Sequence, residues 1–189
     1  VGALATASFN TATDTPGFES VATVTFTTKG QVLAGGKVVL VMPAETGAQH
    51  SWRFADNGDT SMETDGSTNP PTIAFSTPST DAPTTTAVGY TVATRTLIFT
   101  TADETMVQGT EHVFTITNAL TPSSVVGANN VVATTQDSQG KNIDTTTTMA
   151  TDDIVAGVLA GAKTFNTNTD TPGFSDTAQV TFTTAGRVE

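Results

Sequence analysis

Residues 22–28 read ATVTFTT, a strict alternation of apolar side chains and threonines. In an extended backbone successive side chains point to opposite faces, so Ala22, Val24 and Phe26 share one face and the threonines share the other. Threonine is branched at Cβ, which favours an extended backbone, and its hydroxyl is compatible with water. This stretch therefore predicts a β-strand with one face in a core and the other toward solvent.

Similar stretches along the chain predict an all-β fold. We expect further strands over residues 38–42, 51–54, 72–76, 87–92, 95–101, 112–118 and 130–136. Turn-forming pairs such as Asn57-Gly58 and Gln139-Gly140 separate them, whereas the 3.6-residue spacing of an amphipathic helix is nearly absent. One short helical turn is expected at 103–107. Strands at intervals of about ten residues predict a β-sandwich.

The sequence also repeats itself. Residues 9–32 align without a gap with residues 165–188, at an offset of 156, and 17 of the 24 pairs are identical. Both copies contain TDTPGF, in which proline and glycine are typical of a turn. We therefore expect a tandem array: one full β-sandwich repeat over residues 1–156, its phase open, and the N-terminal part of the next over 157–189. That last segment is a candidate for donating a strand or linking domains.

Composition disfavours several classes of function. Seven Lys and Arg stand against 18 Asp and Glu, a net charge of −11, which argues against nucleic acid and anionic membrane surfaces as partners. The chain has no cysteine, so disulfides, thiolate zinc sites and cysteine nucleophiles are excluded. Its longest apolar run, residues 38–42, is too short to insert across a membrane.

No pattern typical of catalysis stands out in the sequence. The two histidines are His50 and His112, and His112 falls within an expected strand. His50 precedes Ser51, but adjacency in sequence does not make a catalytic triad, because triad residues converge from different parts of a fold. No spacing singles out a carboxylate pair of the kind that glycosidases use. We expect that the protein is not an enzyme and that calcium is its one candidate cofactor.

Calcium is suggested by acidic side chains gathered in loops, since this ion takes oxygen ligands. The loop ADNGDTSMETDG, residues 55–66, and the segment before the repeat restarts supply the candidate ligands, which are Asp56, Asp59, Glu63, Asp65, Asp152 and Asp153. An ion at the second group would stiffen a domain junction. The alternative for both groups is a solvated acidic loop.

Two further kinds of surface site are candidates. Trp52, the single tryptophan, is either a core anchor or a ring that stacks on a sugar in a ligand loop. Threonine clusters near prolines are candidates for O-linked sugar, at Thr84, Thr85, Thr86, Thr145, Thr146, Thr147 and Thr148.

Two long stretches carry a resemblance to a known kind of protein. VTFTTKGQVLAGGKVVLVMP (24–43) and GTEHVFTITNALTPSSVVGANNVVATTQDSQGKNID (109–144) resemble the recurring unit of giant, threonine-rich surface proteins of unicellular algae and related protists. They are more loosely similar to immunoglobulin-type domains of bacterial adhesins. The resemblance implies an immunoglobulin-like β-sandwich in a tandem repeat of about 156 residues, an extracellular or cell-surface location and a fibrous role. It supplies no functional residues.

Two functions follow as hypotheses. In the first, the chain is a structural repeat unit of an extracellular filament, appendage or surface fibre, and its partners are copies of itself or neighbouring repeats. In the second, it is an adhesin stalk or binding domain whose long loop, residues 45–71, recognises glycan or another surface with the help of calcium.

Overall fold

The computed structural model describes residues 1–44, 51–54, 71–145 and 149–186, and within these the chain is all-β. The strands are β1 (Gly2–Ala3), β2 (Ala5–Thr11), β3 (Glu19–Thr27), β4 (Lys37–Val41), β5 (Ile73–Thr77), β6 (Thr84–Thr91), β7 (Thr96–Ala102), β8 (Glu111–Leu120), β9 (Asn130–Gln136), β10 (Asn142–Thr145), β11 (Met149–Thr151), β12 (Ala160–Thr167) and β13 (Ala178–Thr183). A 3₁₀ turn, η1 (Val92–Thr94), connects β6 to β7. None of the described residues forms a helix of the length and hydrophobicity that crossing a membrane requires.

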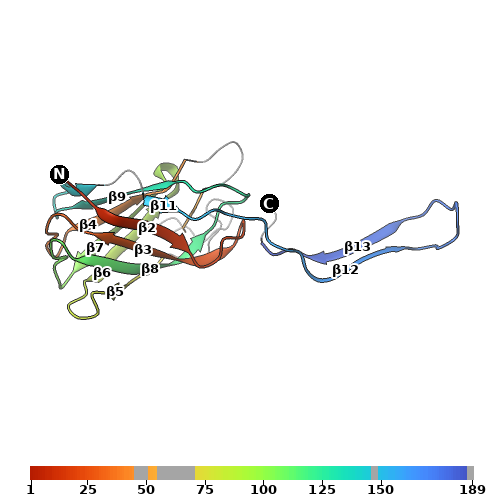
Figure 1. The fold of residues 1–189 in the computed structure, drawn as a ribbon, viewed down its shortest axis with the longest axis horizontal. Coiled ribbons are helices and arrows are strands. Elements are labelled where there is room, and N and C mark those ends of the chain that lie inside the picture. The colour runs from red at the N-terminus through yellow and green to blue at the C-terminus, as the bar shows by residue number, and fades with distance from the viewer. Residues whose placement is uncertain (45–50, 55–70, 146–148, 187–189) are drawn as a thin grey trace.

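Strands β1 to β11 form the body of the protein (residues 1–154), a single sheet folded over so that it nearly closes on itself. The strand order is β5-β8-β3-β2-β11-β9-β4-β7-β6, with β10 beside β9 and β1 beside β10. The short strand β11 joins the two halves, because it runs parallel to β2 and antiparallel to β9. Figure 1 shows the two halves lying against each other.

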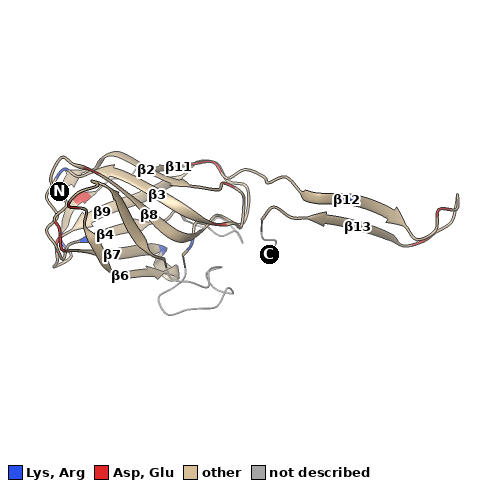
Figure 2. Ribbon diagram, turned by 90° about the horizontal axis from the view of Figure 1, so that it is seen from below, with Lys and Arg blue, Asp and Glu red and all other residues tan. Residues whose placement is uncertain are grey.

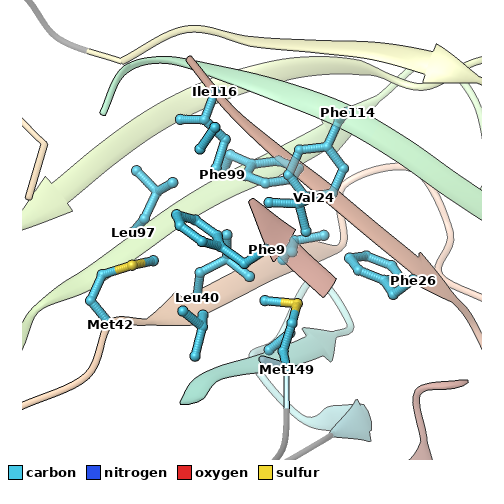
Figure 3. Close-up of a cluster of buried hydrophobic side chains, with 14 of the residues drawn as sticks. Phe9, Val24, Phe26, Leu40, Met42, Leu97, Phe99, Phe114, Ile116 and Met149 are labelled. Carbon is cyan, nitrogen blue, oxygen red and sulfur yellow. The ribbon is translucent and has the colours of Figure 1, made fainter. Parts of the chain in front are cut away.

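The core lies between the two halves and is built from the inward-facing positions of their strands (Figure 3). Along β3, Ala22, Val24 and Phe26 are fully buried, while the threonines between them are partly exposed, as the alternation predicts. Across the core, the rings of Phe99 and Phe114 meet edge to face with centroids 5.2 Å apart. Each buried large apolar side chain contributes about 1.5–3 kcal/mol, so this interior is the main source of stability.

Most of the expected strands are confirmed. Those predicted over residues 38–42, 72–76, 87–92, 95–101, 112–118 and 130–136 are present as β4, β5, β6, β7, β8 and β9. Residues 51–54 differ, since they make only an isolated bridge between Arg53 and Leu120. The helical turn predicted at 103–107 is wrong. Met106 is drawn into the core, and its backbone exchanges hydrogen bonds of 3.0 and 2.9 Å with Val32 instead.

Strands β12 and β13 form a separate two-stranded sheet, the C-terminal hairpin (residues 160–183). It projects from one end of the body, and two views at right angles show it extending away from the core (Figures 1 and 2). Residues 155–159 lead into it from the body, and residues 184–186 follow it; we call these two segments its base.

Candidate assembly surface

From Thr164 on, the C-terminal hairpin has the same strand register as the hairpin formed by β2 and β3. Nearer its base the register differs by one residue, since Ala160 pairs with Thr183 whereas Ala5 pairs with Thr27. In the body Phe9 lies opposite Val24, and in the C-terminal hairpin Phe165 lies opposite Val180. Both residues of the second pair are displaced by 156 positions from those of the first, and the same displacement relates three further pairs. The body pairs are Ser8↔Thr25, Asn10↔Thr23 and Thr11↔Ala22, and their counterparts are Thr164↔Thr181, Asn166↔Gln179 and Thr167↔Ala178. The repeated sequence therefore forms the same local structure in two different surroundings.

The loops at the ends of the two hairpins also match. The Thr11 hydroxyl donates a hydrogen bond of 2.7 Å to Asp14, and the Thr167 hydroxyl donates one of 2.6 Å to Asp170. These bonds lie within each repeated segment and involve no other part of the chain. Local sequence is thus sufficient to shape this part of the loop, as is common for short polar side chains in turns.

Burial is where the two hairpins differ. Phe9, Val24 and Phe26 are fully buried, whereas Phe165 is 72% exposed and Val180 is 60% exposed. Phe182, the counterpart of Phe26, is 50% exposed, and Phe174 at the far loop is 64% exposed. Contiguous apolar surface of this kind marks an interaction site, and a lone two-stranded hairpin is only marginally stable in water.

The body shows what the C-terminal hairpin is missing. The outer edge of β3 pairs with β8, which places Val24 opposite Phe114, and the outer edge of β2 pairs with β11. Among the described residues β12 and β13 pair only with each other. Their outer edges therefore present backbone N–H and C=O groups to solvent, which can pair with further strands.

β13 is also shorter than β3, its counterpart in the body. β3 begins at Glu19, because Glu19 and Ser20 pair with the end of β8. β13 begins only at Ala178, the counterpart of Ala22, so three residues that are strand in the body are not strand in the C-terminal hairpin. A neighbouring strand is thus needed to extend this part of the hairpin to its full length.

The base of the C-terminal hairpin is closely fitted to the body. The Val155 N–H donates a hydrogen bond of 2.8 Å to the Asp14 carbonyl. Gly186 has no room for a side chain, since a Cβ there would lie 2.0 Å from the Pro16 carbonyl oxygen. Gly157 is similarly placed, with a Cβ position 2.6 Å from Cγ2 of Thr15. The first TDTPGF loop (residues 13–18) therefore supports the base, while the second (residues 169–174) lies at the far tip.

The calcium candidates have a mixed outcome. Asp152 and Asp153 lie next to the base, and burial together with the neighbouring carboxylates of Asp14 and Asp153 raises the pKa of Asp152. Asp153 already accepts a hydrogen bond from the Ala128 N–H. Within the ranges that the structure describes, no group of three or more His, Cys, Asp or Glu side chains is arranged to hold a metal. The candidates outside the described residues are Asp56, Asp59, Glu63 and Asp65. Calcium binding remains a prediction.

The other candidates lie in the core, on strands β6 and β10, or outside the described residues. Trp52 is 2% exposed and packs edge-on against Phe9, with ring centroids 6.2 Å apart, so its ring faces the interior. His112 is buried beside Phe26 and Phe75, and this burial lowers its pKa. His50 lies outside the described residues. On β6, Thr84 and Thr86 are exposed and Thr85 is half-buried; Thr145 on β10 is half-buried, and Thr146, Thr147 and Thr148 lie outside the described residues.

One important residue escaped the sequence analysis. Asp144 on β10 is fully buried, and one of its carboxylate oxygens accepts hydrogen bonds from the N–H groups of Lys29 (3.0 Å) and Gly30 (2.8 Å). It thereby holds the turn that follows β3. The one signal in the sequence was the Lys29-Gly30 turn itself, because its two N–H groups need an acceptor once they are buried. The counterparts of this turn in the repeat are Ala185 and Gly186.

Chemically, the C-terminal hairpin is a preformed pair of strands that can form backbone hydrogen bonds along two edges and bury one apolar face. The residues that would cover that face are present in the body, where they cover the equivalent hairpin. No protein-family model, curated protein or solved structure matches this chain.

Proposed function

We propose that this protein is a structural unit of an extracellular filament, appendage or surface fibre, in which immunoglobulin-like β-sandwiches follow one another at intervals of 156 residues. A single observation carries the proposal. The C-terminal hairpin reproduces the register of the β2–β3 hairpin but leaves Phe165, Val180 and Phe182 exposed, whereas their counterparts are fully buried. Such a hairpin is the first part of a second sandwich whose remaining strands come from a neighbouring unit. The partners are therefore copies of the same unit.

The body supports the sandwich part of the proposal. Its two sheet halves pack face to face around aromatic side chains, and nearly all pairings are antiparallel. The exceptions are β1 with β10 and β2 with β11. Short strands that follow one another through turns, with a core between two layers, are typical of immunoglobulin-like sandwiches.

The surface supports a role in assembly. Only 13% of the residues are charged, and threonines on the solvent faces of the strands supply hydroxyls instead. Some of these hydroxyls pair across strands, as Thr72 and Thr117 do at 2.9 Å. A surface with few charges can pack against copies of itself with little desolvation of ions.

Electron microscopy of the native, full-length material, averaged along any fibre, tests the role. We expect ordered fibres with an axial repeat of roughly 40 Å, because a ten-residue strand alone spans about 33 Å and loops add to it. A matched sample is treated with a calcium chelator. Flexible strings of beads that stiffen only with calcium would favour the adhesin stalk instead, and separate particles without contacts would refute both.

The tandem arrangement has its own test in solution. In a chain in which residues 34–189 follow Glu189, the hairpin at 160–183 should become the first two strands of a second body. Hydrogen exchange of its amides should then slow to the rate seen for β2 and β3, while the hairpin at the new C-terminus stays fast. The 189-residue chain is the control. A middle hairpin that still exchanges as fast as in the control would contradict the tandem sandwich.

A further inference from the structure

We infer that the C-terminal hairpin also enters the body of a second, separate copy of this chain, in place of that copy's own β2–β3 hairpin, so that units join without a covalent link. The inference rests on the proposed function and names the partner of the same surface. The partner must supply three things: a strand that pairs with β13, a strand that pairs with β12, and a hydrogen-bond acceptor for the N–H groups of the turn after β13.

The body of a second copy supplies all three parts at matching positions. By the 156-residue offset, β13 would pair antiparallel with β8, with Val180 opposite Phe114 and Gln179 opposite Thr115. β12 would pair parallel with β11, with Phe165 opposite Thr151. The N–H groups of Ala185 and Gly186 would meet the carboxylate of Asp144, which holds the equivalent turn in the body.

From Phe165 on, the side chains of the C-terminal hairpin fit that place with little change. The start of β12 differs, because three residues separate Ala160 from Thr164 where two separate Ala5 from Ser8. Its inward-facing residues Ala178, Val180 and Phe182 are identical to Ala22, Val24 and Phe26, so the core gains and loses no volume at these three positions. Residues 165–188 differ from residues 9–32 at seven positions, and six of these positions are exposed or half-buried in the body. The seventh places Asp176 where the body has Ser20, which is 9% exposed at the end of β3.

Concentration decides how often the exchange occurs. A body's own hairpin is tethered to it, which corresponds to an effective concentration of about 1 mM for a short linker. The incoming hairpin makes nearly the same contacts from Phe165 on, but it differs in the bulge of β12 and at Asp176, so equal competition is the upper limit. At about 100 µM chain, up to roughly one body in ten should then contain the hairpin of a second copy.

The absence of cysteine from the chain makes this measurable in the full-length protein. Gln179→Cys combined with Thr115→Cys places two thiols at paired positions only when the hairpin of one copy enters another. Directly opposite partners have Cβ atoms about 4.5–5.5 Å apart and a disulfide spans about 3.5–4.5 Å, so a small shift of the two strands lets the bond form. Within one copy the hairpin points away from β8 (Figure 1). The protein is unfolded in urea, refolded at a series of concentrations, oxidised and separated on a non-reducing gel.

We expect disulfide-linked oligomers whose fraction rises with chain concentration. The matched control pairs Gln179→Cys with Val132→Cys, a half-buried position on β9 in the other sheet half, and should give only the background of random collisions. Linked oligomers no more abundant than in this control would overturn the inference.

Three substitutions in the Gln179→Cys/Thr115→Cys chain sharpen the result. Val180→Thr buries a hydroxyl in the incoming hairpin and should lower the linked fraction about tenfold, whereas Val24→Thr weakens the resident hairpin and should raise it. Asp176→Ser restores the residue of the body and should also raise it. A linked fraction unaffected by Val180→Thr would contradict insertion even if Val24→Thr failed to fold.

The outcomes separate this inference from the proposed function. Ordered native fibres together with background linking would leave the structural role standing and remove exchange between separate chains. Efficient linking together with a fast-exchanging middle hairpin in the two-unit chain would support exchange between separate chains and would contradict the tandem sandwich.

Discussion

Phe9 and Phe165 offer a matched pair of substitutions. They hold equivalent positions in hairpins of the same register, each opposite a valine, yet Phe9 is fully buried and Phe165 is 72% exposed. Phe9→Ala removes a ring that packs on Trp52 and leaves a cavity in the core, which should lower the free energy of unfolding by about 3–5 kcal/mol. Phe165→Ala should change it by about 0.5 kcal/mol or less, as for other exposed positions.

Urea unfolding measures both effects. Trp52 is the single tryptophan and lies 6.2 Å from Phe9, so its fluorescence reports on this part of the core, and circular dichroism checks that both probes give one transition. In the two-unit chain, Phe165→Ala in the middle hairpin should become as costly as Phe9→Ala. Equal losses from the two substitutions in the 189-residue chain would refute the reasoning, and so would a loss below about 1 kcal/mol for Phe9→Ala.

Three further predictions concern the buried polar groups and the base. Asp144→Ala leaves two N–H groups without their acceptor and should cost about 2–4 kcal/mol in urea unfolding, while Asp144→Asn keeps one oxygen and should cost less. Burial lowers the pKa of His112, so as the pH drops below 6.5 this side chain takes up a proton more readily in the unfolded chain than in the folded one. The free energy of unfolding should therefore fall with pH, by up to about 1.4 kcal/mol per pH unit. His112→Phe should remove that part of the loss in unfolding measured from pH 7 to 5, and an identical pH profile would contradict it. Gly186→Ala should displace the base from Pro16 and speed proteolysis of residues 155–159 several-fold, with the urea midpoint unchanged; an unchanged cleavage rate would show that the contact does not hold the hairpin.

The elements that could be predicted from sequence are those with a clear local pattern. Within β3 and β8 apolar and polar residues alternate over residues 22–27 and 114–117, so the sequence alone shows which of these side chains face the core. β2 reads ATASFNT and alternates from Ala5 to Asn10, but alanine favours strands only weakly, and a register shift between Ala5 and Ser8 interrupts the pairing. β10 and β11 are four and three residues long, too short for a period of two to stand out, and they exist because neighbouring strands supply their hydrogen bonds.

The candidate site divides in the same way. The TDTPGF repeat and the identical segments around it were visible in the sequence and marked the region where the C-terminal hairpin lies. The role of Asp144 was not visible, because it depends on a contact between residues more than 100 positions apart. Trp52 likewise had two possible roles in the sequence, and its burial against Phe9 is a property of the packed core.

Strand pairing within each hairpin follows from local sequence: two segments with 17 identities in 24 positions adopt the same register and the same threonine to aspartate hydrogen bond. These interactions are local, so they form wherever the segment occurs. Which hairpin is buried depends instead on packing between distant parts of the chain. Removing an apolar face from water requires another surface to cover it, and in the described residues β8, β11 and the opposite half of the sheet provide that surface for β2 and β3 alone.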